Sequence, residues 1–493
     1  MIVPRMPRWI ILAILLLVVL ARSAVFVLWP ESYFDADQAV FGLMAKHLSE
    51  GRAFPVFMYG QSYILAVEAW MAAPVFLLAG VSATALKLPL LLLNFVIAWL
   101  LMRTFEREMA LGPAAAAAAS LPFVLPSVAT AAIFVEPSGG NLEPYLYVPL
   151  IWLTRDRPLW CGAILGVGFL HREFTIYGLA ALLAIEAFDR TLFTRAGLAR
   201  RGVMAGAAGA IWLAVQVLKR FSSGSGPGTA FDSIYGASNN ILELAARTCI
   251  SPATALKGGA RLVSIHWPAL FGTAPYSLNA FSIESVGRQG LAWSSWLPLL
   301  VVLLAAAGIV FSAMSRPGPR PTPRFAVYLI LVGAFSSAGY VFGRCGEVNF
   351  YAMRYELLSI LAIAGIIGWF LSVPVPRPLT VTWGLVFAAW LAVLAVPHAR
   401  LAAEYATERP IPAKRQLIRV LVSRGIRYGT ADYWIAYYVD FMTREGIILA
   451  ADEPQRIKTY NAIVAEHAAE AVRLSRRPCD GGVPLIPGVY LCR

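Results

Sequence analysis

The sequence predicts a mostly α-helical protein that crosses a membrane many times and ends in a small α/β domain. Hydrophobic residues make up 59% of its 493 residues and charged residues only 14%, whereas a soluble domain is usually about a quarter charged. The apolar residues occur in runs of about 18–23, which is long enough to cross a hydrocarbon core of roughly 30 Å. Only the last part of the chain, from His398, has a soluble composition.

The formal net charge of +13 does not indicate nucleic-acid binding. The basic residues form no stripe with interleaved aromatic residues, which is the usual footprint of such a surface. They lie between the apolar runs, and this pattern is typical of the Arg and Lys residues that stay on the cytoplasmic side of a membrane.

Placing these basic clusters in the cytoplasm predicts 11 spans. The first follows the basic segment MIVPRMPR and is too long for a signal peptide, so we expect an uncleaved span with a cytoplasmic N-terminus. The assignment requires that the apolar stretch 63–80 lies in the outer interface or re-enters. The predicted spans cover residues 9–29, 87–102, 111–133, 143–154, 158–171, 174–188, 202–218, 291–313, 325–342, 355–372 and 379–396.

We therefore divide the chain into a membrane domain, residues 1–397, and a soluble extracytoplasmic α/β domain, residues 398–493. The membrane domain has a first outer loop at 30–86 and a polar outer loop at 219–290. In the terminal domain, runs with helical periodicity alternate with β-rich runs such as GIILAA.

Four cysteines fall on the predicted outer side, where disulfides can form. This placement allows a Cys479–Cys492 bond and leaves a Cys249–Cys345 bond open, while Cys161 lies in a span. The chain has no N-x-Ser/Thr site, which favours a bacterial-type inner membrane over a eukaryotic secretory lumen.

Charged and polar residues accumulate at the outer ends of the predicted spans. A charged group within a span costs about 2.5–3.5 kcal/mol on insertion scales, so such groups indicate a functional site. The groups on this side are Asp35, Asp37, Glu68, Glu136, Glu143, His171, Arg172, Glu173, Arg344, Glu347 and Arg354.

The residues after Asp37 predict an amphipathic helix that ends at Gly51. Its apolar face holds Val40, Phe41, Met44, Ala45 and Leu48, whereas Lys46, His47 and Glu50 avoid that face. We expect this helix to lie along the membrane interface, with Asp35 as its N-cap. Capping accounts for Asp35 but leaves Asp37 for a functional role.

The first outer loop, beginning DADQAVFGLMAKHLSEG, resembles that of GT-C glycosyltransferases. It is most similar to the glycosyltransferase-39-like group, which includes the protein mannosyltransferases and the lipid A aminoarabinose transferase. The spacing of Asp37, Phe41, Ala45 and Gly51 fits this group and assigns its catalytic aspartate to Asp37. The sequence departs from the group at Gln38, where many members have Glu, and at YGQSY, where many have Lys-Pro-Pro.

Three later segments fit the same pattern. NLEPYLY points to Glu143, MRYELLSI to Arg354 and Tyr355, and LHREFTIYG to Arg172, with His171 second. The predicted catalytic residues are Asp37 and Glu143. The predicted substrate- or phosphate-binding residues are Arg354, Arg172, His171, Tyr355, Asp35, Glu68, Tyr59 and Gln61.

The resemblance implies an inverting transfer of a sugar from a polyprenyl-phosphate donor to an acceptor on the outer face of the membrane. Arg354 and Arg172 would hold the phosphate, and Asp37 would take the acceptor proton. The acceptor is a glycan, a lipid or a protein. No cofactor is expected, and a divalent ion on the Asp35–Asp37 pair is less favoured because two carboxylates form a poor cage.

Two alternative functions remain at this point. A transporter or flippase of lipid-linked sugars would predict internal repeats, which the sequence lacks. A ligase or polymerase of lipid-linked glycans would use the 219–290 loop, with Arg247, Arg261, His266 and Arg288. We interpret the isolated His266, His398 and His467 as packing or surface residues.

Overall fold

The computed structural model describes residues 6–61, 64–219, 251–273, 293–315, 323–343 and 350–492. Most of these residues form helices that are assembled into one bundle. The bundle helices are, in chain order, α1 (Arg8–Leu28), α2 (Ala36–Ser49), α3 (Val67–Ala79), α4 (Ala83–Met109), α5 (Pro113–Val124), α6 (Val128–Ile133), α7 (Pro144–Thr154), α8 (Pro158–His171), α9 (Ile176–Phe188), α10 (Arg195–Lys219), α13 (Pro252–Arg261), α14 (Trp267–Phe271), α15 (Trp296–Ser315), α16 (Arg324–Gly343), α17 (Ser359–Ser372) and α18 (Arg377–Thr407). Short 3-10 or π turns are η1 (Pro30–Tyr33), η2 (Glu173–Thr175), η4 (Leu262–His266), η5 (Trp293–Ser295) and η6 (Phe350–Glu356).

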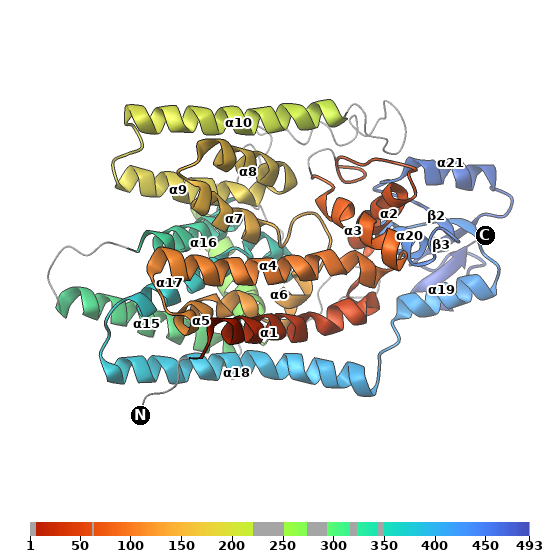
Figure 1. Ribbon diagram of the computed structural model, residues 1–493. Helices are drawn as coiled ribbons and strands as arrows, with labels where there is room; N and C mark the ends of the chain where they lie inside the picture. Colours follow the sequence, from red (N-terminus) through yellow and green to blue (C-terminus); the bar gives the residue numbers. More distant parts are fainter. Residues whose placement is uncertain are drawn as a thin grey trace.

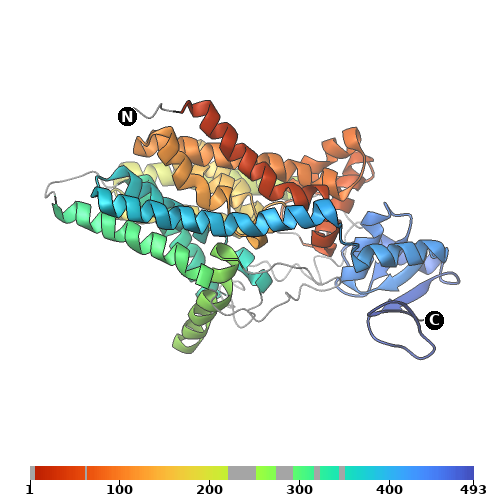
Figure 2. The ribbon, with the colours of Figure 1, turned by 90° about the horizontal axis from the view of Figure 1, so that it is seen from below.

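The long helices run side by side, and the C-terminal domain covers one end of the bundle (Figure 1). The view from below shows the same domain at one end and the N-terminus at the other (Figure 2). Within the described residues, α1, α4, α10, α15, α16 and α18 are long and apolar enough to cross a membrane. The chain is therefore a mostly helical, multi-pass membrane protein with a small terminal sheet, as predicted.

The structure differs from the prediction in one predicted span and in one predicted loop. The expected continuous span 111–133 is divided into α5 and α6, because Pro126 lacks the N–H that a helix needs and Ser127 caps the new helix at Thr130 N. Part of the expected polar loop 219–290 is helical, since residues 251–273 form α13, η4 and α14.

The stretch 63–80 contains α3, which has only 13 residues. At 1.5 Å per residue such a helix is about 20 Å long, shorter than a hydrocarbon core of about 30 Å. Because α8 and α17, in predicted spans, have only 14 residues each, length alone does not distinguish α3 from them, and its incomplete crossing stays a prediction.

The terminal domain is an α/β unit. Its elements are α19 (Ala413–Ser423), β1 (Tyr428–Ala431), α20 (Tyr433–Met442), β2 (Ile448–Ala451), α21 (Lys458–Glu466), β3 (Val472–Ser475), β4 (Val483–Ile486) and β5 (Val489–Cys492). The strand order is β2-β1-β3-β5-β4, with β1 parallel to both neighbours and β5 antiparallel to β3 and β4. The predicted Cys479–Cys492 disulfide is present, whereas Cys249 and Cys345 lie outside the described residues.

This domain shares a hydrophobic core with the first outer loop. Phe34 and Phe441 stack with their ring centroids 5.3 Å apart, and a Cβ on Gly42 would come within 2.4 Å of the Phe441 ring. The amphipathic helix expected after Asp37 is therefore present as α2, and the terminal domain packs against it; that α2 lies along the membrane interface stays a prediction. Its polar side chains Lys46 and His47 are buried against the terminal domain.

The opposite end of the bundle carries most of the arginine clusters. There Arg8 pairs with Glu106, Arg155 with Glu108, Arg200 and Arg201 with Glu186, and Arg324 with Asp189. Because α1 begins at this end and α18 leads to the terminal domain at the other (Figure 1), the basic clusters and the domain lie on different sides, as the charge pattern predicts. That the clustered end faces the cytoplasm stays a prediction.

Candidate functional site

The N-terminus of α2 places the two aspartates in different environments. Asp35 is the N-cap, and its Oδ1 accepts a hydrogen bond from Gln38 N at 2.9 Å, as the sequence predicts. Asp37, in the first turn, accepts a hydrogen bond from the Tyr433 hydroxyl of the terminal domain at 2.5 Å. The pair is therefore divided into a structural carboxylate and one whose position depends on the terminal domain.

Positive groups approach this pair from distant parts of the chain. Burial and the Asp37 carboxylate raise the pKa of Asp35, while the charges of Lys414 and Arg354 partly offset this rise. Lys414 is itself buried and donates to the Phe34 carbonyl at 2.8 Å, and burial lowers its pKa to about 8. The aspartates thus lie in a largely desolvated region that also contains cations.

Two predicted phosphate-binding arginines meet at one tyrosine. Arg354 donates to the Tyr355 hydroxyl at 3.1 Å and lies over the ring, 5.2 Å from its centroid. The Arg172 guanidinium lies 6.0 Å from the centroid of the same Tyr355 ring. It also lies over the Phe174 ring, 5.0 Å from its centroid. Arg172 begins the η2 turn after α8, and Arg354 lies in η6. The site therefore combines two guanidinium groups from separate connecting segments.

A second polar group forms around Glu68, at the start of α3. One of its oxygens, Oε1, accepts hydrogen bonds from Gly139 N at 2.8 Å and Gly140 N at 2.7 Å. Its other oxygen, Oε2, lies 3.2 Å from His171 Nε2. His171 Nδ1 in turn lies 2.9 Å from the Tyr147 hydroxyl.

The glycines of this group have conformations that other residues rarely adopt. Gly139 and Gly140 have φ values of +89° and +86°, and successive residues of this kind present their N–H groups to an anion. A Cβ on Gly140 would also come within 2.8 Å of the Arg172 Cβ. The loop that binds Glu68 thus packs directly on the side-chain stem of a predicted phosphate-binding residue.

Glu143 is buried beside this group, as the N-cap residue of α7. Neither of its carboxylate oxygens has a hydrogen-bond partner. Ligand atoms of Glu143, Glu68 and His171, one from each, lie within 4.8 Å of one another. The structure therefore places Glu143 with Glu68 and His171 and gives it no hydrogen bond to Asp37.

Tyr59 and Gln61 lie at the junction with the terminal domain. The Tyr59 hydroxyl is 3.0 Å from His47 Nδ1. Gln61 lies beside the Arg456 guanidinium. In the amide orientation that satisfies both side chains, the Gln61 oxygen is 3.0 and 3.1 Å from the two terminal nitrogens of Arg456. Arg456 also donates to the Gly60 carbonyl at 3.0 Å. These two residues, expected to contact substrate, thus take part in holding the domain.

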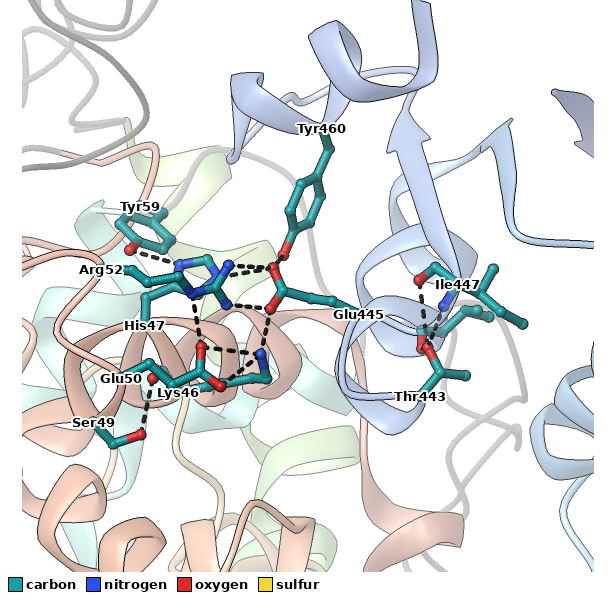
Figure 3. Close-up of polar contacts among 11 residues, drawn as sticks. Lys46, His47, Ser49, Glu50, Arg52, Tyr59, Thr443, Glu445, Ile447 and Tyr460 are labelled. Atoms are coloured by element: carbon teal, nitrogen blue, oxygen red, sulfur yellow. Dashed lines mark hydrogen bonds and ion pairs between the residues drawn. The ribbon is translucent and has the colours of Figure 1, made fainter. Parts of the chain in front are cut away.

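A glutamate of the terminal domain completes this junction (Figure 3). Glu445 Oε2 lies 2.5 Å from Lys46 Nζ, and its Oε1 lies 3.0 Å from His47 Nε2. Arg52 and the Tyr460 hydroxyl also donate to this carboxylate. We call these five residues the Glu445 cluster.

The structure thus reveals contributions that the sequence did not indicate. Tyr433 and the Glu445 cluster depend on contacts across nearly 400 residues, for which no local pattern exists. The Gly139–Gly140 pair does carry a signal, since adjacent glycines predict positive φ values. His266, expected to be isolated, is instead bonded to Glu356, with Nδ1 and Oε1 2.5 Å apart.

Several predicted residues lie outside the described part of the chain. They are Arg247, Arg288, Arg344 and Glu347. Of the other residues that the sequence singled out, His398 Nε2 is 3.0 Å from the Pro126 carbonyl, and His467 stacks on Tyr428. Both contacts agree with a packing role.

Comparisons with known proteins identify the fold. No family model and no curated protein matches the sequence. The crystal structure of the apo oligosaccharyltransferase of Archaeoglobus fulgidus is similar over 96% of this chain and 70% of its own, with a TM-score of 0.51 and 12% identity. Crystal structures of ArnT from Cupriavidus metallidurans, apo and bound to undecaprenyl phosphate, match 94% of this chain and 92% of theirs with TM-scores of 0.39 and identities of 13% and 12%. The chain therefore has the fold of this oligosaccharyltransferase.

Proposed function

We propose that this protein is an inverting glycosyltransferase that takes its sugar from a polyprenyl-phosphate donor at the outer face of the membrane. The observation that carries the proposal is that Arg354, which lies with Arg172 over the Tyr355 ring, acts electrostatically on Asp35, two residues before Asp37. A carboxylate and fixed cations are the groups that such a transfer requires, and the fold of an oligosaccharyltransferase agrees with it.

In the proposed reaction, Asp37 accepts the proton of the acceptor hydroxyl. The acceptor oxygen forms a bond to the anomeric carbon while the bond from that carbon to the phosphate oxygen breaks. The electron pair leaves with the polyprenyl phosphate, and Arg172 and Arg354 stabilise its developing charge. Attack from the face opposite the phosphate inverts the configuration.

Tyr433 supports this role because its hydroxyl holds the Asp37 carboxylate in one orientation. We propose that no metal ion binds between Asp35 and Asp37. One oxygen of Asp35 is used as a helix cap, and Asp37 already accepts from Tyr433, so the pair presents few free oxygens to an ion.

The donor site can be tested by measuring the binding of undecaprenyl phosphate to the purified protein with native mass spectrometry. We expect the double variant Arg172→Gln, Arg354→Gln to bind at least about tenfold more weakly, because each charge-assisted hydrogen bond contributes about 1.5–3 kcal/mol. Arg103→Gln is the matched control, since Arg103 is an exposed arginine that pairs with Glu106 at the opposite end of the bundle. Equal binding by the double variant and the control would contradict the proposed donor site.

A further inference from the structure

Three side chains that commonly bind metal ions converge beside the proposed donor site. They are Glu68, Glu143 and His171, and one ligand atom from each lies within 4.8 Å of the other two. All three are buried. Among the described residues, no other group of three or more His, Cys, Asp or Glu side chains is arranged in this way.

Two of these side chains are already oriented by the protein. The Gly139 and Gly140 N–H groups bind Glu68 Oε1 and thereby direct Oε2 toward His171 Nε2. The Tyr147 hydroxyl binds His171 Nδ1, so that Nε2 is the nitrogen that faces the cluster. Such outer hydrogen bonds are the usual means by which proteins orient histidine and carboxylate ligands.

The third side chain lacks a partner of its own. Glu143 is 2% exposed, and neither carboxylate oxygen has a hydrogen-bond partner. Two carboxylates against one imidazole leave an excess of negative charge even when His171 is protonated. A buried carboxylate without a partner is costly, and a bound cation would remove that cost.

We propose that this cluster binds a divalent transition-metal ion, with zinc as the preferred ion, through Glu68 Oε2, His171 Nε2 and the Glu143 carboxylate. A water molecule would take the fourth position. Zinc binds histidine nitrogen and carboxylate oxygen at about 2.0–2.2 Å, which places tetrahedral ligand atoms about 3.3 Å apart. The distance from Glu68 Oε2 to His171 Nε2 is already 3.2 Å, and a Glu143 oxygen lies within 4.8 Å of a ligand atom of each of the other two residues.

The site would join three segments of the membrane domain. Glu68 begins α3, Glu143 precedes α7, and His171 ends α8. Because Gly140 packs on Arg172, the ion would fix the loop against which this arginine rests. The role is one of positioning, and the site is separate from the Asp35–Asp37 pair.

The test is the metal content of the full-length protein, purified without chelators and then exposed to zinc chloride and desalted. We expect a single zinc ion per chain in the wild type, and loss of that ion in Glu143→Gln and in His171→Asn. His266→Asn is the matched control, because His266 and Glu356 form an equally buried pair that belongs to no three-ligand group among the described residues. This variant should keep the ion.

A second measurement does not depend on the variants folding. X-ray absorption of the wild-type protein should show nitrogen and oxygen ligands at about 2.0–2.2 Å, with no sulfur. Replacement by cobalt chloride should produce visible absorption bands. The proposal would be overturned by any of three results. The wild type binds neither zinc nor cobalt, the X-ray absorption spectrum shows sulfur ligands, or a folded Glu143→Gln variant retains zinc.

Discussion

In the described part of the chain, the Glu445 cluster and the cluster of Glu68, Glu143 and His171 both combine glutamate with histidine, but they differ in charge and burial. In the Glu445 cluster, one carboxylate is surrounded by Lys46, His47, Arg52 and the Tyr460 hydroxyl. In the cluster of Glu68, Glu143 and His171, two carboxylates share one histidine, and Glu143 has no hydrogen-bond partner. The first cluster is satisfied by the chain itself, whereas the second requires a proton or another cation.

This difference indicates different roles. A carboxylate that the protein surrounds with donors holds two segments together, and the Glu445 cluster joins the terminal domain to α2 (Figure 3). A cluster with unused carboxylate oxygens stays open to chemistry or to a ligand. The terminal domain thus stabilises the position of α2, and the second cluster lies beside Arg172, where we place the donor phosphate.

The largest effect on stability is expected at Glu68. Glu68→Gln leaves His171 buried without its carboxylate, and breaking a buried ion pair in this way costs about 3–5 kcal/mol. Thermal unfolding of the detergent-solubilised protein, followed by intrinsic fluorescence, should show a clearly lowered midpoint. An unchanged midpoint would mean that the Glu68 cluster does not hold α3 and α8 together.

A smaller effect is expected at Glu445, where the change acts on the docking of the domain. Glu445→Gln weakens several charge-assisted hydrogen bonds and should lower the docking free energy by about 2 kcal/mol. This corresponds to roughly 30-fold faster hydrogen exchange in the amides of α2 that open with the domain. Glu50→Gln serves as the control, because Glu50 is 39% exposed and pairs with the same Lys46 and Arg52, and exposed pairs of this kind contribute only about 0.2–1 kcal/mol each. Equal hydrogen-exchange rates in the Glu445→Gln and Glu50→Gln variants would contradict the view that Glu445 holds the terminal domain on α2.

The Glu445 cluster should also give the docking a dependence on pH. Although burial alone would raise the pKa of Glu445, hydrogen bonds from His47, Arg52 and Lys46 lower it below the ordinary value of 4.5. The docked state therefore binds fewer protons than the open state, so its stability is complete above about pH 5 and is lost as the pH falls below 4.5. Thermal midpoints measured from pH 7 to pH 4 should fall. The loss of stability that depends on Glu445, and that Glu445→Gln abolishes, should be about 1 kcal/mol or less at pH 4. A fall of equal size in the variant would exclude Glu445 as its source.

Much of the membrane architecture is predictable because its causes are local or compositional. The lengths of the apolar runs predict the helices, and the arginine clusters predict the end of the bundle that they share. Asp35 is recognisable as a cap from its own position before α2. The Gly139–Gly140 turn is predictable as a turn, although its ligand Glu68 is not, because the contact joins residues about 70 positions apart.

The contribution of the terminal domain could not be predicted in this way. The polar face of α2 is typical of a helix on a membrane surface, and only the folded domain reveals that Glu445 covers Lys46 and His47. Likewise, no feature of the segment ADYWIAYY indicates that Tyr433 reaches Asp37. The sequence pattern named Glu143 as catalytic, and this role stays a prediction; that Glu143 lies beside Glu68 and His171 could not be read from the sequence, because the three come from separate segments.

The central claim is that Asp37 is the base of a sugar transfer at the outer end of the bundle. The most direct measurement compares Asp37→Asn with Glu31→Gln, which changes a partly exposed carboxylate of the same loop that pairs with Arg415. Each variant is expressed in a strain that lacks the wild-type gene, and its surface glycans and lipids are analysed by mass spectrometry. We predict that Glu31→Gln restores the wild-type products and that Asp37→Asn, present in the membrane at the same level, restores none. Wild-type products in the Asp37→Asn strain would contradict the assignment.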